Sequence, residues 1–195
     1  MRRKIFTYTC FFEGQQEEMY FKYVSKLIKH IRPEVGIKLN KTSKLNTLAK
    51  SSTEVPKIAV FDYDCELATF ENRVKTCKKS KIRIFYTSLN FDLWLLLHKE
   101  KFTKNVSDNA DYIPRIRKVY NLNKTDNIKE EKIINKILSQ ISLDDVKFAI
   151  KNCNEIMNDK LEADKLKIGK DFEYYPNPSM SIQEFFEGVL KELGM

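Results

Sequence analysis

The sequence predicts an α/β fold with a mostly parallel sheet flanked by helices, followed by a helical C-terminal part. Short apolar segments alternate with helical patterns in the first half of the chain, which is typical of parallel strands joined by crossover helices. The strand-like segments are residues 4–12, 35–40, 57–64 and 81–88. In the second half the strand signals fade and helical periodicity dominates. We expect a core over residues 1–98 and a helical extension over 99–195, packed together as one compact unit.

The helices are predicted from apolar residues that recur at helical spacing. Residues 15–31 follow the first strand, 43–51 carry a weaker pattern, and 66–79 connect the last two strands. In the second half, helices are expected at residues 91–99, 112–121, 128–140, 142–163 and 181–193. Residues 170–180 contain two prolines and are expected to form a loop.

The formal net charge of +8 over 195 residues favours a polyanionic partner. Lysine and arginine gain affinity for phosphates by releasing condensed counterions, although a lysine-rich composition can also lack a functional meaning. No stretch approaches the 18 apolar residues that a membrane-spanning helix needs. The basic, apolar N-terminus has no small-residue cleavage site and runs directly into Glu13. We therefore expect a cytoplasmic protein without a membrane segment.

Cysteines and histidines form no recognisable site in the sequence. The four cysteines show no CxxC pair and no cysteine–histidine spacing typical of zinc, so reduced thiols are expected. His30 and His98 are isolated from any serine or cysteine nucleophile motif. This pattern disfavours a catalytic triad.

Acidic residues stand where two of the predicted strands end. Glu13 follows the first strand, and Asp62 and Asp64 close the strand at 57–64. The carboxyl ends of parallel strands meet at one edge of a sheet, where α/β proteins bind ligands. Side-chain alternation places Asp62 and Asp64 on one face, and Glu17 points back toward the same place from one helical turn beyond Glu13.

Carboxylates that converge on one cleft repel each other unless a cation neutralises them. Oxygen ligands without histidine or cysteine suit Mg²⁺ or Mn²⁺, and such clusters serve two-metal phosphoryl chemistry. The alternative is a solvated turn at Asp62-Tyr63-Asp64 and glutamates that favour the dipole of a helix N-terminus. Residue types and spacing leave both interpretations open.

The order of these acids resembles the Toprim domain of topoisomerases, primases and OLD-type nucleases. A strand, Glu13-Gly14 and a helix are followed by a strand that ends in Asp62-x-Asp64. Glu17 matches the acidic position that OLD-type nucleases add to their metal site. The resemblance implies a Toprim-like catalytic core in the first half of the chain.

Three further segments resemble the RloB family within that superfamily. SLNFDLWLLLHK at 88–99 is similar to the family signature NPSFELWLLLHF, with leucine at position 89 in place of proline. NPSMSIQEFFEGVL at 177–190 is similar to the C-terminal NPST segment and its helix, with methionine in place of threonine. EGQQEEMYFKYV at 13–24 fits the pattern EGxxTEpxYF. Together these segments span nearly the whole chain.

The resemblance implies a site for Mg²⁺ or Mn²⁺. Its metal ligands would be Glu13, Glu17, Asp62, Asp64 and Asp92, of which Glu13, Asp62 and Asp64 would be catalytic. Asp92 stands where the family has glutamate, so a carboxylate is kept with a shorter reach. Its alternative role is that of an acid at a helix N-terminus.

Candidate nucleic-acid contacts lie in two places. Ser88 and Asn90 are expected near a phosphate, because the strand at 81–88 should end on the same edge as the acids. The densest basic run could contact phosphates or be a solvated helix end, and consists of Lys75, Lys78, Lys79, Lys81 and Arg83.

The leading functional hypothesis is a Mg²⁺-dependent Toprim endonuclease that cleaves DNA or RNA, with tRNA as a candidate substrate. The resemblance further implies a toxic effector of a bacterial anti-phage system, with an ABC-type or AAA-type ATPase as partner. The alternatives are a non-catalytic Toprim module that docks on such an ATPase and a nucleotidyl-transfer enzyme. The oligomeric state, including a homo-oligomer, stays open.

Overall fold

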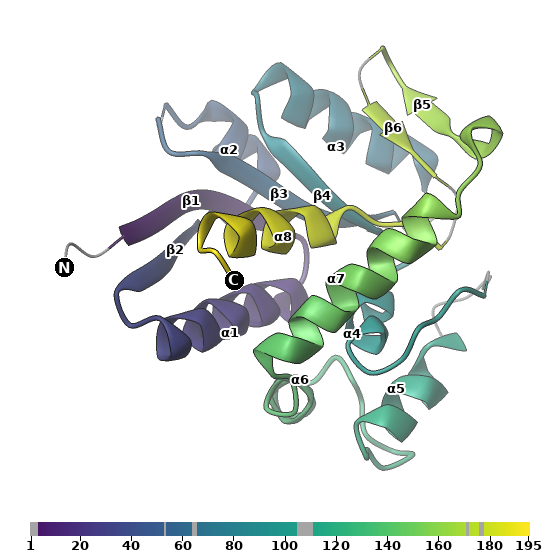
Figure 1. The fold of residues 1–195 in the computed structure, drawn as a ribbon. Coiled ribbons are helices and arrows are strands. Elements are labelled where there is room, and N and C mark those ends of the chain that lie inside the picture. Colours follow the sequence, from purple (N-terminus) through teal and green to yellow (C-terminus); the bar gives the residue numbers. More distant parts are fainter. Residues whose placement is uncertain (1–3, 53, 64–65, 105–110, 171, 176–177) are drawn as a thin grey trace.

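A four-stranded parallel sheet forms the centre of the molecule (Figure 1). The computed structural model describes residues 4–52, 54–63, 66–104, 111–170, 172–175 and 178–195. The strands follow the spatial order β2-β1-β3-β4, and all three pairings are parallel. Their bounds are β1 Lys4–Phe12, β2 Val35–Lys41, β3 Lys57–Tyr63 and β4 Arg83–Ser88. The predicted α/β fold with a parallel sheet is confirmed.

Helices cover both faces of this sheet, because the strands are apolar on both sides. Side chains such as Cys10, Val60 and Phe85 face one hydrophobic cluster, whereas Ala59 and Phe61 face a second cluster. The first cluster includes residues of α1 (Gln15–Ile31), α4 (Asp92–Leu97) and α8 (Ile182–Glu192). The second cluster includes residues of α2 (Leu45–Lys50) and α3 (Leu67–Lys79).

The second half of the chain is mainly helical and shares the first cluster with the sheet. Its further helices are α5 (Ile113–Val119), α6 (Glu131–Leu138) and α7 (Leu143–Asn158). Helix α8 returns to the sheet, where the ring of Phe185 lies 5.1 Å from that of Tyr8 and 5.0 Å from that of Phe21. The predicted boundary at residue 98 stays a prediction.

Two expectations for the segment after α7 were wrong. The helix predicted to run to residue 163 ends at Asn158, and a single 3₁₀ turn follows at Glu162–Asp164. The predicted loop at 170–180 contains strand β6 (Phe172–Tyr174), which pairs antiparallel with β5 (Leu166–Ile168). These strands of three residues are too short for a pattern of alternation to identify them.

A C-terminal segment protects the outer edge of β4. Thr87 and Met180 form an antiparallel bridge, and the backbone N–H of Ser88 donates to the carbonyl of Ser179 at 2.8 Å. The N–H of Ser179 in turn donates to Ser88 Oγ at 2.8 Å. The contact blunts an exposed edge. It also fixes the end of β4, from which part of the candidate site is built.

Within the described residues, no helix is both long enough and apolar enough to cross a membrane.

Candidate active site

The acids predicted at the strand ends lie at the same edge of the sheet. Strands β1 and β3 are parallel neighbours, with Phe12 opposite Val60. The N–H of Glu13 continues this ladder by donating to the carbonyl of Val60 at 3.0 Å. Glu13 therefore lies next to Asp62, as the parallel arrangement predicted. Asp64, the second aspartate of the motif, lies outside the described residues.

Glu13 is held by a guanidinium group and by the backbone. Arg73 of α3 donates to both carboxylate oxygens, with Nη2 2.5 Å from Oε1 and Nη1 2.7 Å from Oε2. The N–H of Asp62 also donates to Oε2, at 3.0 Å. Two parallel N–H···O bonds of this kind fix the orientation of both groups. Arg73 thus compensates the charge that was expected to bind a metal ion.

Asp62 is oriented from the neighbouring strand. Thr87 of β4 lies directly opposite Asp62 in the ladder, and its hydroxyl donates to Asp62 Oδ1. Thr87 is buried, so the carboxylate oxygen that it binds is tied to the sheet rather than to bulk solvent.

Glu17 is a buried acid that two other carboxylates, those of Glu13 and Asp92, influence electrostatically. Its side chain is buried in the first turn of α1, and its Oε2 atom has no hydrogen-bond partner. Burial raises the pKa of Glu17 from its usual 4.5 to about 7, and the Glu13 and Asp92 carboxylates add to this rise. A hydrogen bond with its own backbone and the charge of Lys129 act in the opposite direction.

Gly14 makes room for this carboxylate. A Cβ atom at position 14 would lie 2.5 Å from Glu17 Oε2 and 3.2 Å from Glu17 Cδ. Real Cβ atoms do not approach oxygen so closely. The glycine of the Glu13-Gly14 pair therefore lets the Glu17 carboxylate fold back over the start of α1.

Asp92 also acts on Glu17 electrostatically and is almost fully buried, with 1% of its surface exposed. The amide of Asn90 donates to its Oδ2 at 2.9 Å, and the N–H of Asp92 donates back to Asn90 Oδ1 at 2.9 Å. The ammonium group of Lys129 lies 3.0 Å from Asp92 Oδ1 and also donates to Gln16 Oε1 at 3.0 Å. One lysine thus links α1 to the start of α4.

The turn that carries Asn90 is strained. Leu89 adopts φ 62°, a left-handed conformation that costs a residue with a branched side chain about 1 kcal/mol. Its N–H donates to the carbonyl of Tyr63 at 2.9 Å, and its side chain is buried in the core. A proline ring cannot adopt this φ, so the turn differs locally from the proline-containing signature that it resembles.

The structure brings part of the predicted site together. Glu13, Glu17 and Asp92 interact electrostatically, whereas Asp62 lies beside Glu13. Among the residues that the structure describes, no three His, Cys, Asp or Glu side chains form a metal-binding group. The chemistry of these residues nevertheless suits a hard cation such as Mg²⁺. All the donors are oxygens, one oxygen of Glu17 has no partner, and Gly14 leaves room for that carboxylate.

The predicted nucleic-acid contacts do not all lie near these acids. Ser88 is fully buried and binds the C-terminal segment, and Asn90 is 6% exposed and holds Asp92. The basic run occupies the last turns of α3 and the start of β4. Arg83 begins β4 opposite Ile58, so it lies roughly 13 Å from Asp62 along the strands, for four residues at about 3.3 Å each. Lys75 lies closer to the acids, two residues from Arg73 on α3.

Four residues of the site were missed from the sequence, namely Gln16, Arg73, Thr87 and Lys129. Only Thr87 had a signal, because it sits near the end of a predicted strand. Lys129 lies 113 residues from Gln16 along the chain, and Arg73 lies 60 residues from Glu13.

A comparison with protein-family models matches the RloB-like protein model over residues 8–187. This range includes nearly all of the 195 residues and every described residue of the candidate site. The chain belongs to the RloB-like family. No curated protein and no solved structure matched it. The RloB resemblance identified from the 13–24, 88–99 and 177–190 segments is thereby confirmed.

The two segments that resemble the RloB family signatures contact each other in the structure. Ser88 of the 88–99 segment and Ser179 of the 177–190 segment bind each other through two hydrogen bonds of 2.8 Å. In this RloB-like chain, the segments jointly close the edge of the sheet beside Asp92. Their pairing fixes the end of β4 beside the candidate site.

Proposed function

We propose that this chain is a Mg²⁺- or Mn²⁺-dependent endonuclease of the Toprim kind that hydrolyses phosphodiester bonds in DNA or RNA. The observation that carries the proposal is the buried Glu17 carboxylate, whose Oε2 has no partner while two other carboxylates act on it. A buried charge without compensation is costly, and a divalent cation would relieve that cost. RloB-like membership is consistent with this reading.

The proposed metal ligands are Glu13, Glu17, Asp62, Asp64 and Asp92. Bound metal would activate a water molecule and stabilise the leaving oxygen. The chain itself supplies orientation: Thr87 fixes Asp62, Asn90 fixes Asp92, and Gly14 leaves space for Glu17. Arg73, once released from Glu13, presents a planar guanidinium group whose geometry suits a phosphate.

A specific observation favours a second function, the non-catalytic module that docks on an ATPase. Arg73 compensates Glu13 and Lys129 compensates Asp92, so two of the acids are neutralised without a metal ion. In that case the cluster would serve the fold alone. The ATPase partner and the anti-phage role rest on the family resemblance, and the nucleotidyl-transfer alternative has no observation in its favour.

Cleavage by the purified chain tests the proposal directly. Plasmid DNA, total RNA and tRNA would be incubated with Mg²⁺, Mn²⁺ or EDTA. We expect metal-dependent cleavage that falls by at least about a hundredfold in Glu17→Gln and Asp62→Ala, because each change removes a proposed ligand. Glu187→Gln, an exposed glutamate on α8, is the control and should cleave normally.

Equal cleavage by Glu17→Gln and the wild type would contradict the proposed site. Metal binding without cleavage, both by the chain alone and after purification with its ATPase, would favour the docking module.

Gly14→Ala separates the position of Glu17 from the stability of the fold. The clash of 2.5 Å involves the end of a flexible side chain, so the carboxylate moves and the helix persists. We expect cleavage to fall nearly as far as in Glu17→Gln, while the free energy of unfolding changes by about 1 kcal/mol or less.

Urea denaturation and the cleavage assay measure the two quantities. Gly188→Ala is the matched control, because nothing lies within 4 Å of a Cβ atom at that helical glycine. Full activity of Gly14→Ala would show that the position of the Glu17 carboxylate is unimportant.

A further inference from the structure

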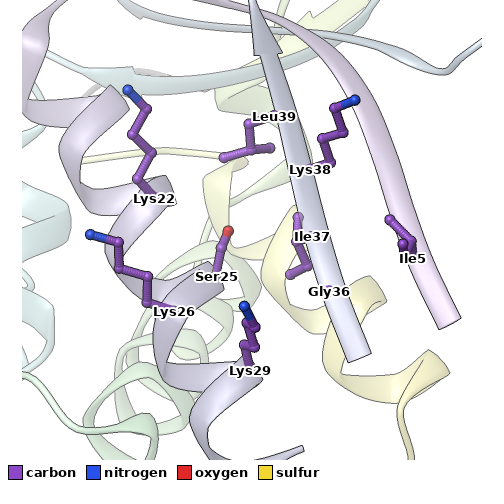
Figure 2. A pocket seen from close by; sticks show the side chains of 9 residues that line it. All are labelled: Ile5, Lys22, Ser25, Lys26, Lys29, Gly36, Ile37, Lys38 and Leu39. Carbon is purple, nitrogen blue, oxygen red and sulfur yellow. The ribbon is translucent and has the colours of Figure 1, made fainter. Parts of the chain in front are cut away.

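A basic groove lies between α1 and the edge strand β2, outside the candidate active site (Figure 2). It has a volume of about 400 Å³. Ile37 and Leu39 of β2 form an aliphatic wall on the side that faces α1 (Figure 2), whereas Ile5 of β1, which pairs with Gly36, lies on the opposite face of the sheet. Ile37 and Leu39 are each partly exposed, so this wall is accessible to a ligand. Lys22, Lys26 and Lys29 of α1 line the opposite wall, and Lys38 of β2 points away from them, toward β1.

The positive charge of the groove is largely uncompensated. Lys22 forms an ion pair of 2.5 Å with Glu18. Lys26, Lys29 and Lys38 have no ion-pair partner among the residues that the structure describes. Glu18 is also bound by Lys41 at the end of β2, so its charge is shared between two lysines. A ligand that fits this groove should therefore be anionic.

The lysines on α1 are regularly spaced. Lys22, Lys26 and Lys29 follow one another along the helix, with axial separations of about 6 Å and about 4.5 Å at 1.5 Å per residue. Their side chains lie in a row beside the strand (Figure 2). A row of cations with an aliphatic strip beside it matches a nucleic-acid strand, in which phosphates repeat along one side and sugars and bases lie on the other.

The same helix connects the groove to the acids. Helix α1 begins at Gln15, directly after Glu13, and carries Glu17 on its buried face and the lysines on its exposed face. Lys22 lies about 7.5 Å and Lys29 about 18 Å from Glu17 along the axis. A strand bound in the groove would thus flank the acids without occupying the same cleft.

We propose that the α1–β2 groove binds the sugar–phosphate backbone of a single-stranded segment that flanks the cleaved bond. The proposal rests on the proposed function only for the statement that the bound strand is also the substrate. Unpaired nucleotides expose sugars and bases that can cover Ile37 and Leu39, whereas a duplex keeps its bases inside. An acidic protein segment would match the charge but not the regular row.

Binding of labelled oligonucleotides in EDTA tests the groove without any cleavage. Fluorescence anisotropy would be measured with a fluorescein-labelled single-stranded RNA, the matching single-stranded DNA and the corresponding duplexes, over a series of salt concentrations. For Lys26→Ala/Lys29→Ala, we expect roughly tenfold weaker binding of the single strands. The slope of log affinity against log salt concentration should be smaller in magnitude by about 1.4, or about 0.7 for each lost phosphate contact.

The control removes the same charge from another helix. Lys147 and Lys151 are exposed on α7, and Lys147→Ala/Lys151→Ala should bind single strands nearly as well as the wild type. The proposal would be overturned if the two double variants bound single strands with equal affinity and equal salt dependence. It would also be overturned if the wild type and both variants bound duplexes more tightly than single strands. The two proposals can fail separately. If the wild type binds single strands but cleaves nothing, and Lys26→Ala/Lys29→Ala binds them more weakly, the groove proposal stands and the nuclease proposal is rejected.

Discussion

Glu17→Gln is expected to stabilise the metal-free protein by about 3 kcal/mol above pH 7. The pKa of Glu17 rises from 4.5 to about 7 because the folded protein buries this carboxyl group. At about 1.36 kcal/mol per pH unit, that difference corresponds to about 3 kcal/mol of lost stability once the group is ionised. Glutamine has a similar shape and carries no charge, so the variant avoids this loss.

The sign follows from proton binding in the two states. Because the folded pKa of Glu17 is the higher one, the stabilising contribution is complete below pH 4.5 and is lost as the pH rises to about 7. The stability difference between Glu17→Gln and the wild type should therefore grow across that range and then stay constant. Urea denaturation in EDTA at a series of pH values measures it, with Glu187→Gln as the control.

His98 titrates in the same range with the opposite effect, so only the difference between proteins is informative. Burial lowers the pKa of His98 to about 4. Its ring lies between the hydroxyl of Tyr20, at 2.7 Å, and the carbonyl of Trp94, at 2.8 Å, and the carbonyl requires a proton on Nδ1. Stability from His98 falls as the pH drops from 6.5 toward 4 in both proteins, and it cancels when they are compared.

The same variant distinguishes a metal site from a structural acid. Added Mg²⁺ should stabilise the wild type, because a ligand that binds the folded state raises the free energy of unfolding. It should not stabilise Glu17→Gln. A variant less stable than the wild type above pH 7 would show that Glu17 is compensated in solution, and the argument from its burial would be wrong.

Much of the sheet could be predicted from the sequence because of how parallel strands are buried. A strand covered on both faces must be apolar on both, and KIAVFDYD shows this as an uninterrupted apolar run before the acids. Once β1 and β3 are parallel neighbours, Glu13 and Asp62 have to meet at one edge. The position of the acids is thus a consequence of strand direction.

The same rule places part of the predicted basic run. Lys81 and Arg83 precede β4 or begin it, so they lie at the edge where the strands start. Charge density alone suggested either a phosphate-contacting patch or a solvated helix end. Lys22, Lys26 and Lys29 are more widely spaced along the sequence, and only the helix brings them into a row. Local density therefore favoured a different set of lysines from the one that lines the groove.

Arg73 and Lys129 could not be assigned from the sequence, because tertiary packing alone decides which cation reaches which acid. Arg73 is one of several charged residues in a polar helix, where the sequence predicts exposure to solvent. Lys129 lies in the segment before α6. Nothing in their spacing relates them to Glu13 or Asp92. The short hairpin of β5 and β6 was missed for a different reason: its strands have three residues each, too few to show an alternating pattern, although Ile168, Phe172 and Tyr174 are buried.

Lys129→Met is expected to destabilise the protein by about 2 kcal/mol. It leaves Asp92, 1% exposed, without the ammonium group that lies 3.0 Å away. Breaking a buried ion pair from one side costs about 3–5 kcal/mol, and the half-exposed side chain of Lys129 reduces that figure. Asp92→Asn should cost less, because Lys129 can still donate to Gln16 and reach water.

A double-mutant cycle isolates the pair from the separate effects of each change. We expect Lys129→Met and Asp92→Asn to couple by about 1–2 kcal/mol in urea denaturation, because the two groups share one contact. The matched control is Lys101–Glu155, whose N···O distance of 2.6 Å is shorter but whose side chains are 44% and 39% exposed. Water screens that pair, so its coupling should be much smaller.

Distance and burial make opposite predictions for these two pairs, so the cycle decides between them. If distance dominated, the Lys101–Glu155 pair would couple more strongly, and Lys129 would be an ordinary surface lysine. If burial dominates, Lys129 is the cation that makes a buried Asp92 tolerable next to Glu17, whose pKa it also lowers. Lys129→Met should then raise the pKa of Glu17 further. The difference in unfolding free energy between Lys129→Met and the wild type should therefore widen as the pH rises and Glu17 ionises.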